Sequence, residues 1–220
     1  MKLIAHRGKN NHSFQENSWL AFENCLKKDY ISGIECDVRL TKDNQLVVCH
    51  DMSINRVSDG SGLLHNYTLK ELQRYNFGTK QHPTRILTFL EFIRKLKTTK
   101  LILIELKYEG TDYQTYVNRV IAVLKKKTLN YYLCSFNTDI LHYLKKKFPK
   151  YPIGIIVTRL INEHHQDDFD FISLNYHLYP VKNKEVHFVW TVNQEKNIKE
   201  FQKKDIYVIT DKAYLFNNLS

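Results

Sequence analysis

Short runs of apolar and β-branched residues alternate along this chain with longer segments of helical periodicity, and this alternation limits the folds open to it. The predicted strands are Leu3–His6, Gly33–Leu40, Leu46–His50, Leu101–Lys107, Tyr132–Phe136, Ile153–Val157, Phe171–Asn175, Phe188–Val192 and Ile206–Thr210. The predicted helices are Ser18–Lys28, Leu87–Leu96, Tyr113–Lys126, Thr138–Lys147 and Gln194–Lys203. Apolar strands that alternate with helices are typical of a parallel sheet covered by helices. Eight main strands and the short extra strand Leu46–His50 indicate an α/β protein, a (β/α)8 TIM barrel rather than an open sheet.

The element spacing predicts a single domain over residues 1–220. A chain of 220 residues buries a sizeable core but is short for such a barrel, for which about 250 residues are typical. The segment between Asn175 and His187 is too short for a full helix, and this is expected to account for part of the short chain length. Residues 51–82 are rich in polar and turn residues and are interpreted as a small insertion ending in the helical turn Thr68–Tyr75.

Cellular location is predicted from three features. No stretch approaches the roughly 20 apolar residues of a membrane span, and the N-terminus enters a strand pattern without room for a signal peptide. The chain has 4 cysteines without metal-ligand spacing, which favours buried thiols in a reducing cytoplasm over two disulfides.

Two predicted strands carry carboxylates near their C-terminal ends. Glu35 and Asp37 are two residues apart on one strand and point to the same face, and Glu105 and Lys107 repeat this spacing on another. If that face is the barrel lumen, the carboxylates repel each other unless a cation lies between them. Three hard oxygen ligands fit Mg²⁺ or Ca²⁺ better than Zn²⁺. The alternative is that they are strand-end charges paired with Lys107 and Arg39.

Two histidines also follow predicted strands. His6 begins the triplet His6-Arg7-Gly8, and His50 is followed by Asp51. Active sites of (β/α)8 barrels lie at the C-terminal ends of the strands, so these imidazoles are candidates for a general acid and a general base. Arg7 offers a forked cation suited to a phosphate, and Gly8 permits close approach of the backbone. The alternative is that each histidine is only a surface or capping residue.

At these residues the chain resembles the glycerophosphodiester phosphodiesterases. In chain order the matching blocks are His6-Arg7-Gly8, Glu16-Asn17-Ser18, Ala21-Phe22, Glu35-Cys36-Asp37-Val38, Thr41-Lys42-Asp43, Val47-Val48-Cys49-His50-Asp51, Asn55-Arg56, Gly60-Ser61-Gly62, Thr68-Leu69-Lys70-Glu71-Leu72, Leu87-Thr88-Phe89-Leu90-Glu91, Ile104-Glu105-Leu106-Lys107, Ser135-Phe136-Asn137, Trp190-Thr191-Val192-Asn193 and Ile209-Thr210-Asp211. They cover essentially the whole chain. Departures include Gln15 for the usual Pro, Ser18 for Thr and Asn44 for a turn Gly.

The resemblance implies hydrolysis of glycerophosphodiesters to glycerol 3-phosphate and an alcohol in a TIM barrel. One divalent cation, Mg²⁺ or Ca²⁺, would be held by Glu35, Asp37 and Glu105. His6 and His50 would be the acid and the base.

The resemblance also implies a set of substrate-binding residues. Arg7 and Lys107 would contact the phosphate, and Glu16 and Asn17 would support the site from the first loop. Trp190 would face the glycerol or the leaving group, unless it is an aromatic residue of the barrel core.

The positive charge is concentrated away from these residues. Lys and Arg total 33 against 23 Asp and Glu, a formal net charge of +10. The basic clusters fall at predicted helix ends that lead into strands, opposite the active-site face, and comprise Lys27-Lys28, Lys95, Lys97, Lys100, Lys125-Lys126-Lys127, Lys145-Lys146-Lys147, Lys150 and Lys203-Lys204. Lysines there complement helix dipoles. Weak docking of this face on an anionic membrane is the alternative.

Three other functions compete with this prediction. A related barrel could cleave lysophospholipids as a phospholipase D does. A basic nucleic-acid-binding protein would need aromatic residues interleaved with the lysines, and no such pattern or nucleic-acid motif is present. A catalytically inactive binding barrel is disfavoured by the intact histidines and carboxylates.

His164-His165 are expected at the surface, and His177 is a candidate for the barrel mouth. The sequence does not specify the oligomeric state.

Overall fold

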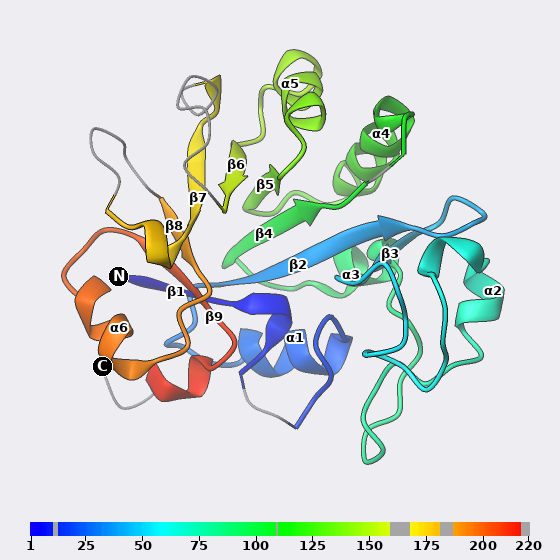
Figure 1. The fold of residues 1–220 in the computed structure, drawn as a ribbon, viewed down its shortest axis with the longest axis horizontal. Helices are drawn as coiled ribbons and strands as arrows, with labels where there is room; N and C mark the ends of the chain where they lie inside the picture. The colour runs from blue at the N-terminus through cyan, green and yellow to red at the C-terminus, as the bar shows by residue number, and fades with distance from the viewer. Residues whose placement is uncertain (11–12, 109, 159–167, 181–186, 217–220) are drawn as a thin grey trace.

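The eight main strands close into a parallel barrel. The structure is a computed structural model that describes residues 1–10, 13–108, 110–158, 168–180 and 187–216. The barrel strands are β1 (Lys2–Ala5), β2 (Gly33–Leu40), β4 (Leu101–Leu106), β5 (Tyr131–Ser135), β6 (Ile153–Val157), β7 (Phe171–Asn175), β8 (Phe188–Trp190) and β9 (Tyr207–Thr210). Neighbouring strands pair in parallel in this order, and β1 pairs with both β9 and β2, which closes the sheet (Figure 1). The predicted (β/α)8 TIM barrel is confirmed.

Helices connect the strands and cover the outside of the barrel. They are α1 (Trp19–Leu26), α3 (Phe89–Lys95), α4 (Tyr113–Leu124), α5 (Thr138–Lys147) and α6 (Glu195–Phe201). Side-chain oxygens fix several helix starts: Ser18 caps α1, Thr88 and Glu91 form a capping box at α3, and Asn137 caps α5. Such caps satisfy backbone N–H groups that have no partner inside the helix. They determine where each chain segment turns from strand to helix.

Alternation along the strands separates two layers of the core. On β2, Ile34, Cys36 and Val38 belong to the large apolar cluster between strands and helices. A smaller cluster fills the lumen and includes Ile4, Leu103, Ile156, Phe188 and Ile209. Since successive side chains of a strand point to opposite faces, the residues of β2 between the outer ones must face the lumen. These inward residues are Glu35 and Asp37.

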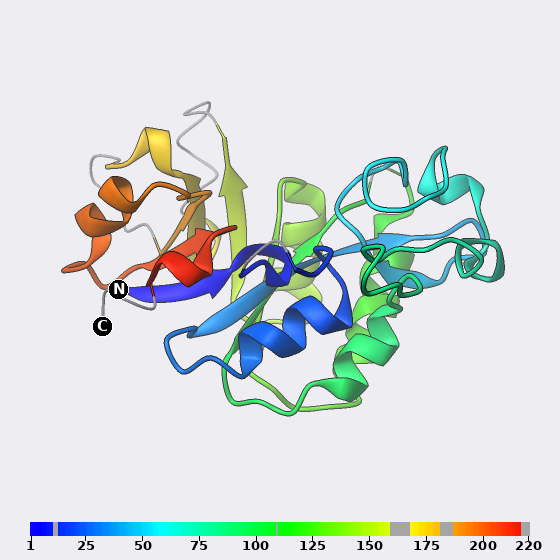
Figure 2. The same cartoon turned by 90° about the horizontal axis from the view of Figure 1, so that it is seen from below.

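The segment after β2 projects from one side of the barrel. β3 (Leu46–Val48) pairs antiparallel with β2, and the chain then forms the 3-10 helix η2 (Leu64–Asn66) and the short helix α2 (Leu69–Leu72). Figures 1 and 2 show these elements at the end of the molecule away from β7 to β9. They enclose an apolar cluster of their own that consists of Val47, Cys49, Ile54, Val57, Leu64, Leu72, Phe77 and Ile86.

Several of the predicted basic clusters are engaged at helix ends. Lys127 Nζ donates to the carbonyl oxygens of Arg94, in the last turn of α3, and of Leu96, its C-cap. Lys100 Nζ donates to the carbonyl oxygen of Lys28, which follows α1. Lysines that bond the last carbonyls of a helix stabilise its C-terminal end. These contacts support the helix-terminal interpretation. Docking on an anionic membrane stays a prediction.

Differences from the predicted elements are confined to their ends. His6 lies in the 3-10 helix η1 (His6–Gly8) instead of β1, and His50 lies beyond β3. The predicted turn Thr68–Tyr75 is helical only over α2. All four cysteines are buried free thiols, as predicted. Among the described residues, no helix has the length and apolar character to cross a bilayer.

We predict that Phe188→Ala destabilises the barrel by about 3–5 kcal/mol, because it opens a cavity in the lumen. The Phe188 side chain is fully buried, and its ring lies 4.7 Å from that of Tyr207 and 5.0 Å from that of Phe171. Urea unfolding measures the change. The control is Tyr214→Ala, at a ring that is 41% exposed, for which a change of about 0.5 kcal/mol or less is expected. Equal effects of the two variants would contradict the assignment of Phe188 to the core.

Candidate active site

Three carboxylates converge at the C-terminal mouth of the barrel. β2 and β4 pair in a register that places Asp37 beside Glu105, and Glu35 lies one inward position below Asp37. One oxygen from each of the three residues lies within 4.8 Å of the others. Glu35 and Asp37 are buried, with 3% and 0% exposure, and Glu105 is partly buried. The two strands, which are far apart in sequence, thus build one acidic cluster.

The cluster is electrostatically frustrated. Burial and the charges of Asp37 and Glu105 raise the pKa of Glu35 well above its ordinary value. Burial and the charge of Asp37 raise the pKa of Glu105 to about 7. Burial also opposes ionisation of Asp37, but Lys107 and Arg7 outweigh it and lower the pKa of this carboxyl. The fixed cations therefore stabilise only part of the negative charge.

Two oxygens of this cluster fit a divalent cation. Glu35 Oε1 and Asp37 Oδ1 are buried, and within the described chain neither accepts a hydrogen bond. Leaving a buried polar atom unsatisfied is costly, and a cation between the carboxylates would remove that cost. The donor set consists of hard oxygens, which suits Mg²⁺ or Ca²⁺. The geometry is therefore compatible with the predicted metal ligands Glu35, Asp37 and Glu105.

His6 lies on one side of the cluster and is held by a carboxylate. Its Nδ1 is 2.9 Å from Asp211 Oδ1, and its Nε2 is 3.9 Å from Glu35 Oε2. Asp211 is fixed in turn, because it accepts a hydrogen bond of 2.8 Å from Asn193 Nδ2. The pKa of Asp211 is lowered because its bonds to His6 and Asn193 and the charge of Lys9 outweigh burial. An ionised Asp211 accepts a hydrogen bond from Nδ1 of His6 and leaves Nε2 directed toward the site.

His50 lies on another side and is held in the same way. Its Nδ1 is 2.6 Å from Asp51 Oδ1, and Arg56 donates to both oxygens of Asp51 at 2.7 and 3.0 Å. Burial, together with the charges of Lys107 and Arg7, lowers the pKa of His50 despite the opposing effect of Asp37. A lowered pKa favours the neutral imidazole, which can accept a proton at Nε2.

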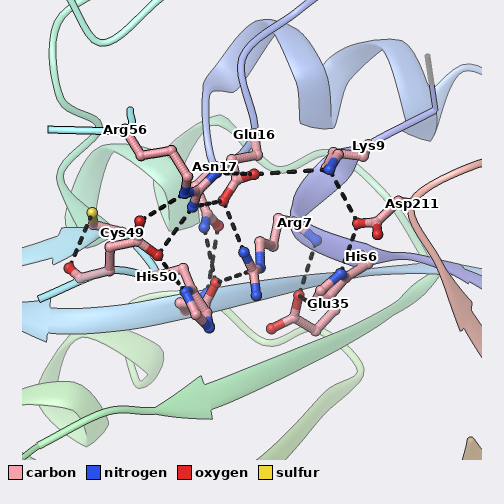
Figure 3. A network of polar contacts seen from close by, with 12 residues as sticks. His6, Arg7, Lys9, Glu16, Asn17, Glu35, Cys49, His50, Arg56 and Asp211 are labelled. Atoms are coloured by element: carbon pink, nitrogen blue, oxygen red, sulfur yellow. Dashed lines mark hydrogen bonds and ion pairs between the residues drawn. The ribbon is translucent and has the colours of Figure 1, made fainter. Parts of the chain in front are cut away.

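Arg7 links the first loop to the carboxylates (Figure 3). Its backbone N–H donates to Glu35 Oε2 at 2.9 Å, and its guanidinium donates to Glu16 Oε1 at 2.9 Å. Glu16 also accepts two hydrogen bonds from Arg56, at 2.9 and 2.7 Å. Asn17 Nδ2 donates to Asp37 Oδ2 at 2.9 Å. The two loop residues thus hold Arg7 and Asp37 in place from behind.

Lys107 completes the cationic side. Its ammonium donates to Glu105 and is 3.5 Å from Asp37 Oδ1. These two carboxylates raise the pKa of Lys107, although burial acts in the opposite direction. The lysine therefore stays charged at the mouth of the barrel.

A cavity of about 110 Å³ opens above these groups. Its polar side is formed by His6, Arg7, Glu35, His50, Glu105 and Lys107. Its apolar side includes Leu103, Phe136, Ile156, Trp190 and Ile209. The rings of Phe136 and Trp190 meet edge to face at 6.1 Å and form one wall. The cavity thus combines a charged floor with an aromatic wall, an arrangement typical of sites for small molecules.

The predicted site residues occupy three positions relative to this cavity. His6, Arg7, His50, Glu35, Glu105, Lys107 and Trp190 line it, Asp37 lies beneath it, and Glu16 and Asn17 lie behind it. His177 is exposed on η4 (Tyr176–Leu178) and is not part of the cavity lining. His164 and His165 lie outside the described residues.

The sequence reasoning gave no role to the residues that orient the histidines. These are Asp51, Arg56, Asn193 and Asp211. A signal was present for Asp211, since closure of the barrel aligns Ala5 of β1 with Thr210 of β9 and places the two following residues, His6 and Asp211, side by side. Arg56 gave no comparable signal, because it reaches the site from the segment after β3.

Comparison with known proteins agrees with this geometry. The family model described as "Glycerophosphoryl diester phosphodiesterase family" matches residues 6–213. A glycerophosphodiester phosphodiesterase of Caldanaerobacter subterraneus is 28% identical, with 99% of this chain and 96% of the relative covered. A Mycoplasma genitalium protein is 32% identical, with 90% and 89% covered.

A solved structure of an Oleispira antarctica phosphodiesterase, in complex with the product sn-glycerol-3-phosphate, has the same fold. It superposes with a TM-score of 0.86 at 23% identity over 99% of this chain and 95% of that one. The family match, which spans nearly the whole chain and includes every residue of the described cavity, identifies this protein as a member of the glycerophosphoryl diester phosphodiesterase family.

Proposed function

We infer that this chain is a metal-dependent glycerophosphodiester phosphodiesterase, which releases glycerol 3-phosphate and an alcohol, with His6 and His50 as acid and base. The observation that carries this proposal is the pair of imidazoles, each held at Nδ1 by a carboxylate, beside a cluster of three carboxylates that no described donor fully satisfies. The name of the Caldanaerobacter relative and the product in the Oleispira structure support the substrate class.

A phosphodiester resists hydrolysis because its negative charge repels nucleophiles and because an alkoxide is a poor leaving group. Glu35, Asp37 and Glu105 would hold a divalent cation, which when bound supplies positive charge to the phosphate and to oxygens near it. Arg7 and Lys107 add fixed cations on the same side of the cavity. A guanidinium and an ammonium positioned before the reaction stabilise charge as it develops in the transition state.

The histidines move the protons. In the first step the glycerol 2-hydroxyl attacks phosphorus in line, one histidine takes its proton at Nε2, and the other protonates the departing alcohol as the P–O bond breaks. The cyclic phosphate is then opened by water with the two roles reversed, which gives glycerol 3-phosphate. Asp211 and Asp51 hold the Nδ1 protons of His6 and His50, so each Nε2 is free for this exchange.

We predict that a chelator abolishes hydrolysis of glycerophosphocholine and that Mg²⁺ or Ca²⁺ restores it. The reason is that Glu35, Asp37 and Glu105 repel each other without a cation. Release of glycerol 3-phosphate from metal-stripped protein, with each ion restored in turn, is the measurement. Parallel assays with glycerophosphoethanolamine and a lysophospholipid separate the proposed activity from that of a lysophospholipase D. Full turnover in excess chelator would overturn the metal dependence.

We predict that His6→Ala and His50→Ala each lower kcat by about 10²–10⁴-fold, the usual contribution of a general acid or base. The matched control is His177→Ala, because this histidine is exposed and outside the cavity. Steady-state rates at saturating glycerophosphocholine give kcat directly. Near-normal turnover of either cavity variant would remove that histidine from the mechanism.

We predict that metal-free protein loses stability as the pH rises from about 4.5 to about 7. Glu105 has a folded-state pKa of about 7 against an ordinary value of 4.5, so the folded state binds its proton more tightly. The stabilisation is complete below the unfolded pKa and is lost as pH rises through the folded pKa. Each pH unit that separates the two pKa values corresponds to about 1.4 kcal/mol.

Thermal unfolding of metal-stripped protein between pH 5 and pH 8 measures this loss. Glu105→Gln is expected to show a smaller decline, because its amide does not titrate. Added Ca²⁺ or Mg²⁺ should raise Tm more at pH 8 than at pH 5, since carboxylates bind cations when deprotonated. Identical pH profiles of the two proteins would contradict the assignment.

A further inference from the structure

Ser173 contributes a buried hydroxyl to the catalytic cavity. It lies in the middle of β7 and lines the cavity, with 2% of its surface exposed. Its neighbours Ile172 and Leu174 belong to the cluster between strands and helices, whereas Phe171 belongs to the lumen cluster. Because successive side chains of a strand alternate between its two faces, the Ser173 side chain points into the lumen.

The Ser173 hydroxyl forms no hydrogen bond with any residue that the structure describes. Two other buried hydroxyls on barrel strands are bonded. Ser135 Oγ donates to the carbonyl oxygen of Leu106 at 2.8 Å, and Thr210 Oγ1 donates to Asn193 Oδ1 at 3.1 Å. A buried hydroxyl without a partner costs free energy, and few occur in folded proteins. Ser173 is therefore a candidate for contact with a ligand.

Trp190 presents a second unpartnered polar atom on the same side of the cavity. Its indole Nε1 is buried and, within the described chain, donates to no acceptor. The pairing of Asn175 on β7 with Trp190 on β8 places the indole one inward position nearer the mouth than Ser173. An indole N–H can only donate, whereas a hydroxyl can donate or accept. Together the two atoms suit a ligand group that both accepts and donates, such as a hydroxyl.

Ser173 and Trp190 face the carboxylates across the cavity. Glu35 and Glu105 are carried by β2 and β4, and the strands follow one another around the closed sheet in the order β1, β2, β4, β5, β6, β7, β8 and β9. β7 and β8 therefore lie opposite β2 and β4 in the ring. A small group that touches the carboxylates on one side can extend across the cavity toward the two unpartnered atoms on the other.

The glycerol arm of the diester fits this position better than the alcohol does. The attacking 2-hydroxyl belongs to glycerol, so in the proposed mechanism this arm lies beside the carboxylates and histidines. The cavity of about 110 Å³ suits a small fragment, whereas the alcohol varies in size between substrates. Glycerol also always carries a further hydroxyl, on its terminal carbon. This is the hydroxyl that can satisfy Ser173 and Trp190 in every substrate.

We propose that Ser173, together with the Trp190 N–H, binds the terminal glycerol hydroxyl and so selects diesters of free glycerol over those in which this hydroxyl is acylated or absent. The hydroxyl accepts from Trp190 Nε1 and donates to Ser173 Oγ. Acylation removes the hydrogen and adds bulk that a cavity of this size does not hold. This inference rests on the proposed function, because it concerns the glycerol arm of that substrate.

The test compares glycerophosphocholine with its 1-deoxy analogue in the presence of Mg²⁺ or Ca²⁺. The analogue keeps the attacking 2-hydroxyl and has a methyl group in place of the terminal CH₂OH. We expect kcat/KM to favour glycerophosphocholine by about 10–100-fold, the range for leaving buried polar groups without a partner. Ser173→Ala should lower kcat/KM for glycerophosphocholine by about 5–50-fold and change that for the analogue by about twofold or less. Trp190→Phe, which removes the N–H and keeps a ring, should act in the same direction.

The matched control is Ser135→Ala, the same substitution at a serine that is 1% exposed on β5 and is not part of the cavity lining. It should leave the substrate ratio unchanged but lower Tm, because the Ser135 hydroxyl bonds Leu106 and Asn137. Ser173→Ala removes an unpartnered hydroxyl, so its Tm should equal or exceed that of the wild type. The two variants separate loss of a ligand contact from loss of stability.

The outcomes distinguish the two proposals. The inference about Ser173 is wrong, and the proposed function stands, if wild-type protein hydrolyses both compounds equally well or if Ser173→Ala lowers kcat/KM equally for both. It is also wrong if Ser173→Ala lowers Tm as much as Ser135→Ala does. If neither compound is hydrolysed, the proposed function fails and this inference fails with it.

Discussion

Repulsion among three carboxylates, two buried and one partly buried, is the constraint on which the rest of the site depends. Glu35 and Asp37 are forced into the lumen because the residues between and beside them pack outward against the helices. Glu105 joins them through the register of β2 and β4. Arg7 and Lys107 offset part of the charge, and the pKa values of Glu35 and Glu105 stay raised. The proposed metal ion is the remaining partner that this arrangement needs.

A few residues around the carboxylate cluster determine which ring nitrogen of each histidine carries the proton. Each of the two histidines has one ring nitrogen bound to an aspartate, and each aspartate is fixed by a residue from a different segment, Asn193 or Arg56. Closure of the barrel brings Asp211 to His6, and the segment after β3 supplies Asp51 and Arg56 to His50. Loss of that segment would therefore disturb His50 and Glu16 together, because Arg56 binds both Asp51 and Glu16.

Positive charge has different roles at the two ends of the barrel. At the N-terminal end of the strands, lysines such as Lys100 and Lys127 bond the carbonyls that end α1 and α3. At the mouth, Arg7 and Lys107 line the catalytic cavity together with Glu35 and Glu105. The net charge of +10 is therefore not one continuous surface feature. Its parts stabilise helices in one place and are proposed to contact the phosphate in another.

The sequence by itself determined the barrel and most of the candidate site. Strand periodicity is local, so the two-residue spacing of Glu35 and Asp37 was enough to place both carboxylates on one face, and strand ends indicated the position of His6 and His50. The tertiary structure alone decided which distant residues meet. The contact of His6 with Asp211, across 205 positions, depends on the register in which the first and last strands meet, and neither strand's local pattern specifies that register. Arg56 likewise reaches Glu16 across 40 positions, a contact that depends on how the segment after β3 packs against the first loop.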